Sequence, residues 1–329
     1  MSAAKKVVTL GGGTGTVAVI SALKQLHANI SAVVAVSDSG GSSGRIRDEF
    51  GFQPVGDLRQ SLAALADPKE QEWIRKILLY RFDKGSGLRG HNLGNLILTA
   101  LQDMTEDTTR SLEIVTRAFN LRGRVIPVTE QTVDLQIEYS DGSSAVGEHI
   151  LDELPEDAKT IESVTLVPDC TVNQAAHDAL TSADYIIIGP GDLYASIMAT
   201  LVVPGVAEAI KQSNAQVIYI SNLMTRYTQT HGMSAKDHVN KIESVLGRTV
   251  DTVLLNTEPI PTDVQEYYES YQEYPVPDDF EPNNPKIFRT KLLSTTLIKK
   301  TDTDTSYRSL LRHDPNKLLT ALESVLQDK

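Results

Sequence analysis

The sequence has one cysteine, one tryptophan and no long hydrophobic run among its 329 residues. The single cysteine, Cys170, cannot form an intramolecular disulfide, which favours a reducing compartment and a buried apolar role for its thiol. No stretch approaches the ~20 consecutive apolar residues that span a bilayer. No signal-peptide pattern precedes the first glycines. We therefore expect a cytoplasmic protein without membrane insertion.

Basic residues are also scarce: 31 lysines and arginines face 43 aspartates and glutamates, which gives a net charge of −12. A field of that sign disfavours nucleic acid as a partner. The seven histidines lack metal-ligand spacing, so a dedicated zinc site is not expected. No Walker A lysine follows the glycines and no G-x-S-x-G elbow is present, which excludes the commonest NTPase and hydrolase signatures.

Short apolar runs alternate with amphipathic helical segments along the chain. Helical spacing is expected at residues 19–26, 58–65, 68–82 and 92–101. A strand and turn at residues 134–142 predict an antiparallel excursion. Strands buried on both faces of a parallel sheet are apolar at consecutive positions, as six runs are here. These runs are residues 7–10, 32–37, 163–167, 185–189, 216–221 and 252–255.

This pattern predicts a Rossmann-like three-layer α/β/α fold with a mainly parallel sheet and a small antiparallel excursion. We expect one domain over residues 1–329, built from two Rossmann-like halves. Residues 258–285 are acidic and rich in proline and tyrosine. They predict either an exposed helix with a loop or a lid over the site, and the surface excursion is the simpler interpretation.

The first strand runs directly into a glycine-rich turn and then into a helix. Gly13, Gly15 and Ala18 satisfy G-x-G-x-x-A, which lets backbone N–H groups approach a phosphate at a helix N-terminus. A tight structural turn without a ligand is the alternative. The predicted phosphate-binding residues are Gly11, Gly12, Gly13, Thr14 and Gly15.

The second strand ends in a loop of glycines, hydroxyls and arginines. Asp38 stands about 20 residues beyond the first turn, where a dinucleotide fold places its ribose-binding carboxylate. The residues after it suit a phosphate better, because they offer a nest of donors and positive charge. A hinge loop whose arginines cap helices is the alternative. The candidates in this loop are Asp38, Ser39, Gly40, Gly41, Ser42 and Arg45.

Polar residues follow further predicted strands or precede helices. Asp57 is placed to cap the helix that follows it. His91 is a candidate for orienting a base, a sugar or a metal-bound water, or else a structural histidine. A second phosphate-type turn follows residues 185–189, and donors follow residues 216–221. The further nucleotide candidates are Asn92, Asn95, Gly189, Gly191, Asp192, Asn222 and Thr225.

Six segments in register resemble one family over nearly the whole chain. They are similar to the CofD-like family and, within it, to the YvcK branch of gluconeogenesis factors. The segments that carry the resemblance are residues 11–15, 38–45, 54–59, 90–95, 189–194 and 312–314.

The resemblance implies a fold and two different activities. The founding enzyme of the family, 2-phospho-L-lactate transferase, moves a phospholactyl group from a guanosine diphosphate donor to a deazaflavin with magnesium. By this resemblance Gly12, Gly13 and Thr14 line the phosphate site, Asp38 faces the acceptor or metal, and Gly191 and Asp192 lie near the nucleotide. The YvcK branch instead supports cell shape and growth on gluconeogenic carbon sources. There, Arg312 is implied to contact a nucleotide sugar such as UDP-N-acetylglucosamine.

Two departures from the family pattern bear on catalysis. After Asn222 the family usually continues into a Gln-Pro-Gly-Glu-Thr-like stretch, whereas Gln229 here places an amide where the carboxylate is expected. An amide neither takes a proton nor carries charge to a metal. The residues after Asp38 also differ from those of the transferase.

Three hypotheses follow. The preferred one is a regulatory protein that binds a UDP-sugar without turning it over and acts on cell-wall or carbon-metabolism proteins. The second is a transferase in which Asp38 and Asp192 hold Mg²⁺ against the pyrophosphate of a donor such as GDP, with His91 as a further catalytic candidate. The weakest is an NAD-binding oxidoreductase. A symmetric homodimer is the default assembly.

Overall fold

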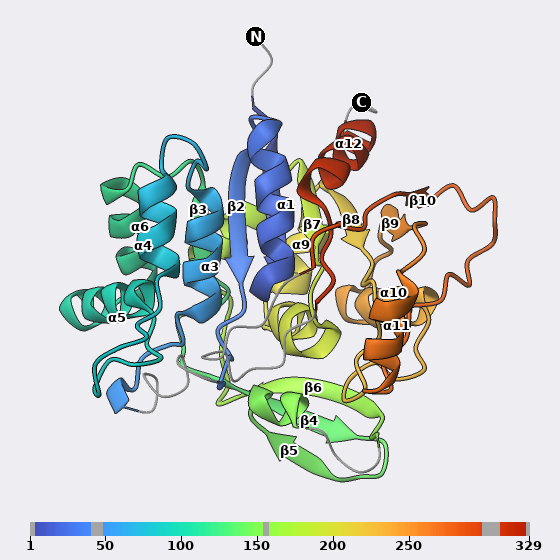
Figure 1. The fold of residues 1–329 in the computed structure, drawn as a ribbon, viewed down its shortest axis with the longest axis horizontal. Helices are drawn as coiled ribbons and strands as arrows, with labels where there is room; N and C mark the ends of the chain where they lie inside the picture. The colour runs from blue at the N-terminus through green and yellow to red at the C-terminus, as the bar shows by residue number, and fades with distance from the viewer. Residues whose placement is uncertain (1–3, 41–48, 154–157, 298–309, 327–329) are drawn as a thin grey trace.

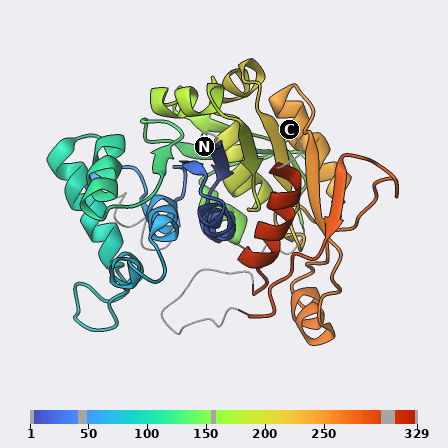
Figure 2. The same ribbon diagram turned by 90° about the horizontal axis from the view of Figure 1, so that it is seen from above.

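The computed structural model describes residues 4–40, 49–153, 158–297 and 310–326. Its centre is a seven-stranded sheet in the order β10-β9-β8-β7-β1-β2-β3, and every pair of neighbours in it is parallel. Helices cover both faces of this sheet (Figure 1; Figure 2). The predicted three-layer α/β/α fold is therefore confirmed. The strands are β1 (Lys6–Gly11), β2 (Asn29–Val34), β3 (Arg124–Pro127), β7 (Tyr185–Ile188), β8 (Gln216–Ile220), β9 (Thr252–Asn256) and β10 (Ile287–Thr290).

The helices fall into groups by their position on the sheet. One face is covered by α1 (Gly13–Gln25), α3 (Gly56–Leu65) and α12 (Pro315–Leu326). The other face is covered by α7 (Gln174–Thr181), α9 (Val206–Gln212) and α10 (Ala235–Leu246), as seen from above in Figure 2. A helical lobe beyond β3 holds α4 (Glu72–Leu79), α5 (Leu93–Thr105) and α6 (Thr108–Ala118). The π-helix η2 (Leu193–Met198) continues into α8 (Ala199–Leu201), and α11 (Thr262–Glu269) stands between β9 and β10.

A second sheet of three antiparallel strands lies below the main sheet in Figure 1. It contains β4 (Asp134–Tyr139), β5 (Ser144–Val146) and β6 (Ile161–Val167), and η1 (Glu148–Asp152) is a single turn between β5 and β6. The predicted antiparallel excursion is confirmed. The prediction that residues 163–167 form a parallel strand of the main sheet is wrong, because β6 pairs antiparallel with β4. Only one face of β6 is buried, through Ile161, Val164 and Leu166.

Two edge strands and several boundaries differ from the sequence prediction. β3 and β10 were not expected; each has only four residues, and each forms an edge of the main sheet. The second strand begins at Asn29 rather than at residue 32. The helix predicted over residues 68–82 is confined to α4. Cys170 is 7 % exposed, which confirms its buried role.

Among the described residues, no single helix is long and apolar enough to cross a membrane. One bent pair in this part of the chain, Leu193–Leu201 and Val206–Gln212 at an angle of 67°, reaches that length and composition. Both segments contribute buried side chains to the core, such as Ile197 and Ile210.

The parallel direction of the main strands decides where a ligand can bind. The carboxyl ends of β1, β2, β7 and β8 reach the same edge of the sheet, the one that faces the small antiparallel sheet in Figure 1. In open α/β sheets this edge carries the ligand crevice. The segment after β9 also packs there: Tyr268 of α11 is 1 % exposed, so residues 258–285 are anchored by a buried tyrosine.

Candidate functional site

Two glycine turns meet at the carboxyl edge of β1 and β7. Gly12 alone separates β1 from α1, and Gly13 has a φ of +67°, in the left-handed region that favours glycine. A Cβ on Gly15 would overlap the carbonyl oxygen of Pro190, and a Cβ on Gly191 would lie 3.6 Å from the carbonyl oxygen of Gly12. The glycine turns after β1 and β7 are therefore neighbours, and they pack so closely at Gly15 that a side chain is excluded there.

Asp57 does not cap α3, contrary to the prediction. The N-cap residue of α3 is Val55, which forms no side-chain cap. Asp57 lies in the first helical turn, and its Oδ2 accepts a hydrogen bond from the N–H of Gly13 at 2.5 Å. The same oxygen occupies the space of a Cβ on Gly12. Asp57 thus sits at the N-terminus of α1, where the helix dipole and free N–H groups favour an anion.

Five carboxylates surround this point. Burial, followed by repulsion from Asp38 and then Asp192, raises the pKa of Asp57 to about 7. Burial and the charge of Asp38 also raise the pKa of Glu148 well above its ordinary value. Burial raises the pKa of Asp152 to about 6, although the guanidinium of Arg226 opposes the shift. The structure therefore brings the two predicted carboxylates, Asp38 and Asp192, into one electrostatic cluster with three others.

Arg226 is the cation of this cluster. Its side chain is 10 % exposed and faces three carboxylates, with Nη2 at 3.1 Å from Asp152, Nε at 3.7 Å from Asp192 and Nη1 at 3.6 Å from Glu273. These residues come from η1, from the turn after β7 and from the segment after α11. One guanidinium therefore joins three separate parts of the chain beside the glycine turns.

Two amides fix the turn that follows β7. The Nδ2 of Asn222 donates to the carbonyl oxygen of Gly191 at 2.8 Å. The Oε1 of Gln229 accepts from the backbone N–H groups of Tyr194 and Ala195 at 3.2 and 3.3 Å. Gln229 thereby satisfies donors at the start of η2, so the amide that departs from the family pattern has a positioning role. Asn222 lies at the edge as predicted.

The predicted residues around the start of α5 take part in packing. Asn92 caps α5 by accepting from the N–H of Asn95. The Oδ1 of Asn95 in turn accepts from the Nε of Arg59 on α3 at 2.7 Å. Arg59 stands two residues after Asp57, so this network supports the helix that carries Asp57. Nucleotide contacts by Asn92, Asn95 and His91 stay predictions.

The loop after β2 is described only in its first residues. The N–H of Gly40 donates to the Oδ1 of Asp38 at 2.9 Å, and the Oγ of Ser39 accepts from the N–H of His149 at 3.0 Å. Ser39 thereby connects the loop to η1. The predicted candidates Gly41, Ser42 and Arg45 lie outside the described residues.

Arg312 reaches the same edge through its neighbours. The N–H of Ser294 donates to the carbonyl oxygen of Arg312 at 2.9 Å, and Leu293 pairs with His313 in an isolated antiparallel bridge. The Nε2 of His313 donates to the carbonyl oxygen of Ser221, directly after β8, at 3.1 Å. Burial lowers the pKa of His313 to about 4, so the ring is neutral at physiological pH. Arg312 is thus held beside the carboxyl end of β8.

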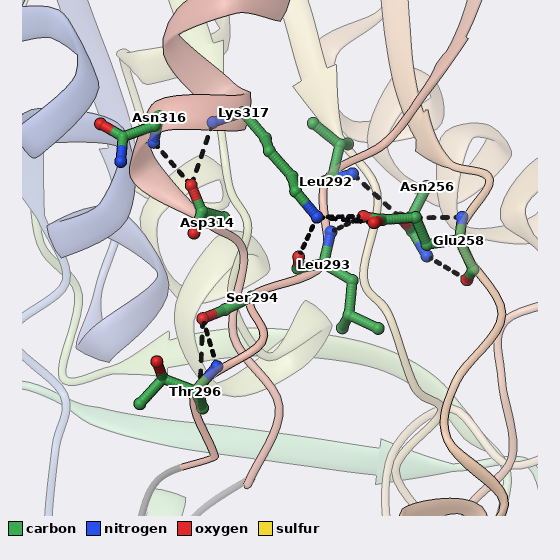
Figure 3. A network of polar contacts seen from close by, with 9 residues as sticks. All are labelled: Asn256, Glu258, Leu292, Leu293, Ser294, Thr296, Asp314, Asn316 and Lys317. Atoms are coloured by element: carbon green, nitrogen blue, oxygen red, sulfur yellow. Dashed lines mark hydrogen bonds and ion pairs between the residues drawn. The ribbon is translucent and has the colours of Figure 1, made fainter.

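A polar network, drawn in Figure 3, secures this segment to the sheet. The Nζ of Lys317 donates to both carboxylate oxygens of Glu258, at 2.6 and 2.8 Å, and to the carbonyl oxygen of Leu293 at 2.7 Å. Asp314 accepts from the N–H groups of Asn316 and Lys317 and so caps α12. We call Glu258, Asp314 and Lys317 the α12 clasp. It fixes the residues on both sides of Arg312 and His313.

The donor set of the carboxylate cluster suits magnesium. Asp38, Asp57 and Asp192 supply the oxygen ligands that Mg²⁺ prefers, and a cation would relieve the repulsion that raises the pKa of Asp57. Within the described residues, no three side chains of the metal-binding types converge on one preformed metal position. Mg²⁺ commonly takes only one or two carboxylates and completes its shell with water and substrate phosphates. The residues therefore fit an ion that arrives with a phosphorylated ligand.

These features define an α/β protein whose carboxyl edge is rich in glycine turns and carboxylates. Residues 7–296 match the family model described as 2-phospho-L-lactate transferase CofD, and the chain belongs to this family. The resemblance carried by the six sequence motifs is thereby confirmed.

The chain is also similar to proteins named gluconeogenesis factor over its whole length. It is 36 % identical to the gluconeogenesis factor of Halalkalibacterium halodurans over 320 residues, which cover 97 % of this chain and 95 % of that one. It is 35 % identical to the gluconeogenesis factor of Bacillus subtilis, with 98 % of each chain covered. A crystal structure of a UPF0052 family member from Bacillus halodurans superimposes with a TM-score of 0.87 at 34 % identity, covering 99 % of this chain and 100 % of that one.

Proposed function

We propose that this protein is a gluconeogenesis factor that binds a nucleotide-linked sugar at the carboxyl edge of its main sheet and regulates other proteins through its occupancy. Relatives with that name match nearly the entire chain, so the proposal does not rest on a shared fragment. We further propose that the protein works in the cytoplasm, and that its targets belong to carbon metabolism and to the control of cell wall and cell shape.

The observation that carries the binding proposal is the contact between the turns at Gly12 and Gly191. Two glycine turns that meet at one edge, one of them at the start of a 13-residue helix, can hold the two phosphates of a nucleoside diphosphate. Gly13 and Thr14 remain partly exposed in the first turn. A pyrophosphate bound there would compete with, or share a cation with, the carboxylate of Asp57.

The position of Arg312 supports a nucleotide sugar as the ligand. His313 ties the Arg312 segment to Ser221 after β8, while Asn222 ties the same strand end to the turn at Gly191. A ligand with phosphates at the glycine turns and a further polar group near β8 would engage both places. UDP-N-acetylglucosamine is the ligand that we propose.

A transferase is the second candidate function. The family match and the cluster of Asp38, Asp57 and Asp192 favour it, because bound Mg²⁺ would neutralise charge that develops on a leaving phosphate. Asp38 and Asp192 would hold the ion, with Asp57 as a third carboxylate. We favour binding without turnover because Gln229 is a neutral amide that already accepts two backbone hydrogen bonds. NAD binding by the G-x-G-x-x-A turn stays the weakest alternative.

Calorimetric titration of the purified protein with UDP-N-acetylglucosamine, with and without Mg²⁺, tests the proposal. GDP and NAD serve as competitors. We expect micromolar binding that is weakened at least about ten-fold in Arg312→Ala, as loss of a charged hydrogen bond predicts. Arg110→Ala is the matched control, since Arg110 is exposed on α6 and pairs with Glu113 of the same helix.

The integrity of the ligand separates the two candidate functions. If the UDP-sugar is recovered intact after hours with the protein and Mg²⁺, regulation is supported. Preferential binding of GDP with Mg²⁺, or steady consumption of the donor, would instead establish the transferase. Absence of any nucleotide binding would refute both.

A further inference from the structure

One region of the helical lobe is basic, although the chain as a whole is acidic. Residues 69–91 carry six basic and three acidic side chains, a net charge of +3, which leaves −15 for the other residues. Lys69, Lys84 and Arg89 are exposed, and in the described part of the chain their side chains form no hydrogen bond or ion pair. This region is therefore basic on an acidic protein, as are residues 286–300, which carry five basic side chains and no acidic one.

The same region exposes large apolar side chains. Trp73 is 73 % exposed, Tyr80 48 %, Leu88 44 % and Leu79 41 %. Trp73 and Tyr80 are seven residues apart at the two ends of α4, which places them on one side of that helix. The Nζ of Lys76 lies 4.8 Å above the Trp73 ring. We call the exposed residues Lys69, Trp73, Lys76, Tyr80, Lys84 and Arg89 the basic aromatic face, of which Lys76 is paired with Glu72 at 2.6 Å. Tryptophan, tyrosine and arginine are the residues that dominate binding energy at protein interfaces.

An acidic, hollowed surface stands at the opposite end of the molecule. Residues 258–285 contain eight acidic side chains and no lysine or arginine. Asp263, Glu266 and Glu269 are exposed along α11. A cavity of about 460 Å³ opens at the start of this helix, lined by Pro259, Pro261, Asp263, Val264, Lys291 and Leu297 among others. That volume is within the range of about 300–1,000 Å³ typical of pockets that bury a ligand.

The two surfaces cannot meet within one molecule. α4 belongs to the lobe beyond the β3 edge of the sheet, whereas α11 stands beside the β10 edge, and both views place these ends apart (Figure 1; Figure 2). They can meet between two molecules. Because the contacting surfaces differ, such an interface is heterologous and repeats from copy to copy.

We propose that copies of this chain associate head to tail, with Trp73 of one copy in the cavity beside α11 of the next. The indole supplies the apolar anchor, which buries on the order of 150–250 Å². The exposed lysines and arginine of the basic aromatic face then lie opposite the acidic side chains of α11. We favour a second copy of this chain as the occupant of the cavity. The basic aromatic face and the acidic side chains of α11 have opposite charges, and every copy carries both.

Other occupants fit the observations less well. A symmetric dimer through the basic aromatic face would place its lysines against their own copies, and like charges repel. An anionic membrane would meet three acidic residues, Glu70, Glu72 and Asp83, among the basic ones, and would repel the remaining −15 charges.

Sedimentation velocity of the full chain over a range of concentrations and salt tests the proposal. We expect association in 50 mM salt that weakens about ten-fold or more in 500 mM salt, because exposed charge pairs are screened. Trp73→Ala abolishes association in the dilute range, whereas Met104→Ala is the matched control, since Met104 is 78 % exposed and outside the face. Thr295→Trp, at an exposed position that lines the cavity, blocks association from the other side.

Charge reversal distinguishes head-to-tail contact from every other arrangement. One variant carries Lys69→Glu, Lys84→Glu and Arg89→Glu, and the other carries Asp263→Lys, Glu266→Lys and Glu269→Lys. Each variant alone is expected to stay monomeric, while their mixture associates again because each altered surface now complements the other. A salt-insensitive dimer that survives both variants would overturn the proposal. A wild-type monomer at all concentrations, or one that sediments with anionic lipid vesicles instead of with itself, would do so as well.

Discussion

Replacing Asp57 by asparagine is expected to stabilise the protein at alkaline pH. The pKa of Asp57 is raised from 3.8 to about 7, chiefly by burial and then by Asp38. Between these values the folded protein holds a proton that the unfolded chain has released, so its stability falls as pH rises towards 7. Above pH 7 the carboxylate is ionised in both the folded and the unfolded state, and the folded state then bears the full free-energy cost of the buried charge. Asparagine cannot ionise, so the substitution removes that cost.

The size of the effect follows from the shift. About three pKa units correspond to about 4 kcal/mol, at 1.36 kcal/mol per unit. The amide of asparagine accepts less strongly from the N–H of Gly13, which offsets on the order of 1 kcal/mol. We expect a net gain of about 3 kcal/mol at pH 8, or roughly 4 °C in Tm for a chain of 329 residues.

Thermal denaturation at pH 8 and pH 5 provides the assay. The gain of Asp57→Asn should be full at pH 8 and should shrink towards pH 5. Asp67→Asn is the matched control beyond the other end of α3, because hydrogen bonds from the N–H groups of Glu70 and Lys69 lower the pKa of Asp67. That substitution should destabilise at pH 8. An equal Tm change at both pH values for Asp57→Asn, or no gain at pH 8, would refute the reasoning.

Two further substitutions probe the ion pairs of the site. Arg226→Met should lower Tm by several degrees, because three carboxylates share this guanidinium and breaking a buried ion pair costs about 3–5 kcal/mol. Arg226→Lys should recover part of that loss in the same thermal scan. Lys317→Met opens the α12 clasp; we expect calorimetry to show UDP-N-acetylglucosamine binding weakened about ten-fold, with Lys236→Met as an exposed control that leaves affinity unchanged.

The sequence predicts the interior of the fold better than its edges. Strands such as β1, β7 and β8 are apolar at consecutive positions because they are buried on both faces, and this pattern is local. The edge strand β3 is buried at three consecutive positions but has only four residues and ends in a proline, and the four residues of β10 are only half-buried, so the signal is weak in both. In β6, apolar and polar residues alternate only in part, so the sequence does not distinguish this strand from a continuous apolar run.

The sequence places residues at the carboxyl edge where the signal is local, and it misses the contacts that join distant parts of the chain. The glycine turns and Asp38 follow strands directly, so their place at the carboxyl edge comes from topology alone. Asp57 was assigned to a cap because local rules favour that role, whereas its actual partner, Gly13, is 44 positions away. Arg226 carries no local signal in the sequence, and its ion pairs join segments that the sequence does not place together.

The two proposals share one short segment of chain, which leads to a last prediction. Leu311 lines the cavity proposed to receive Trp73, and the next residue, Arg312, is held beside the proposed nucleotide-sugar edge. A ligand that fixes this segment changes the free energy with which the cavity binds Trp73 of the next copy. By thermodynamic linkage, association of the copies then changes the affinity for the ligand by the same factor. UDP-N-acetylglucosamine should therefore shift the sedimentation midpoint of the wild type, and its affinity should differ between dilute and concentrated protein by an equal factor. In Trp73→Ala the affinity should not vary with protein concentration, and a concentration dependence that persists in this variant would show that the two sites are not coupled through assembly.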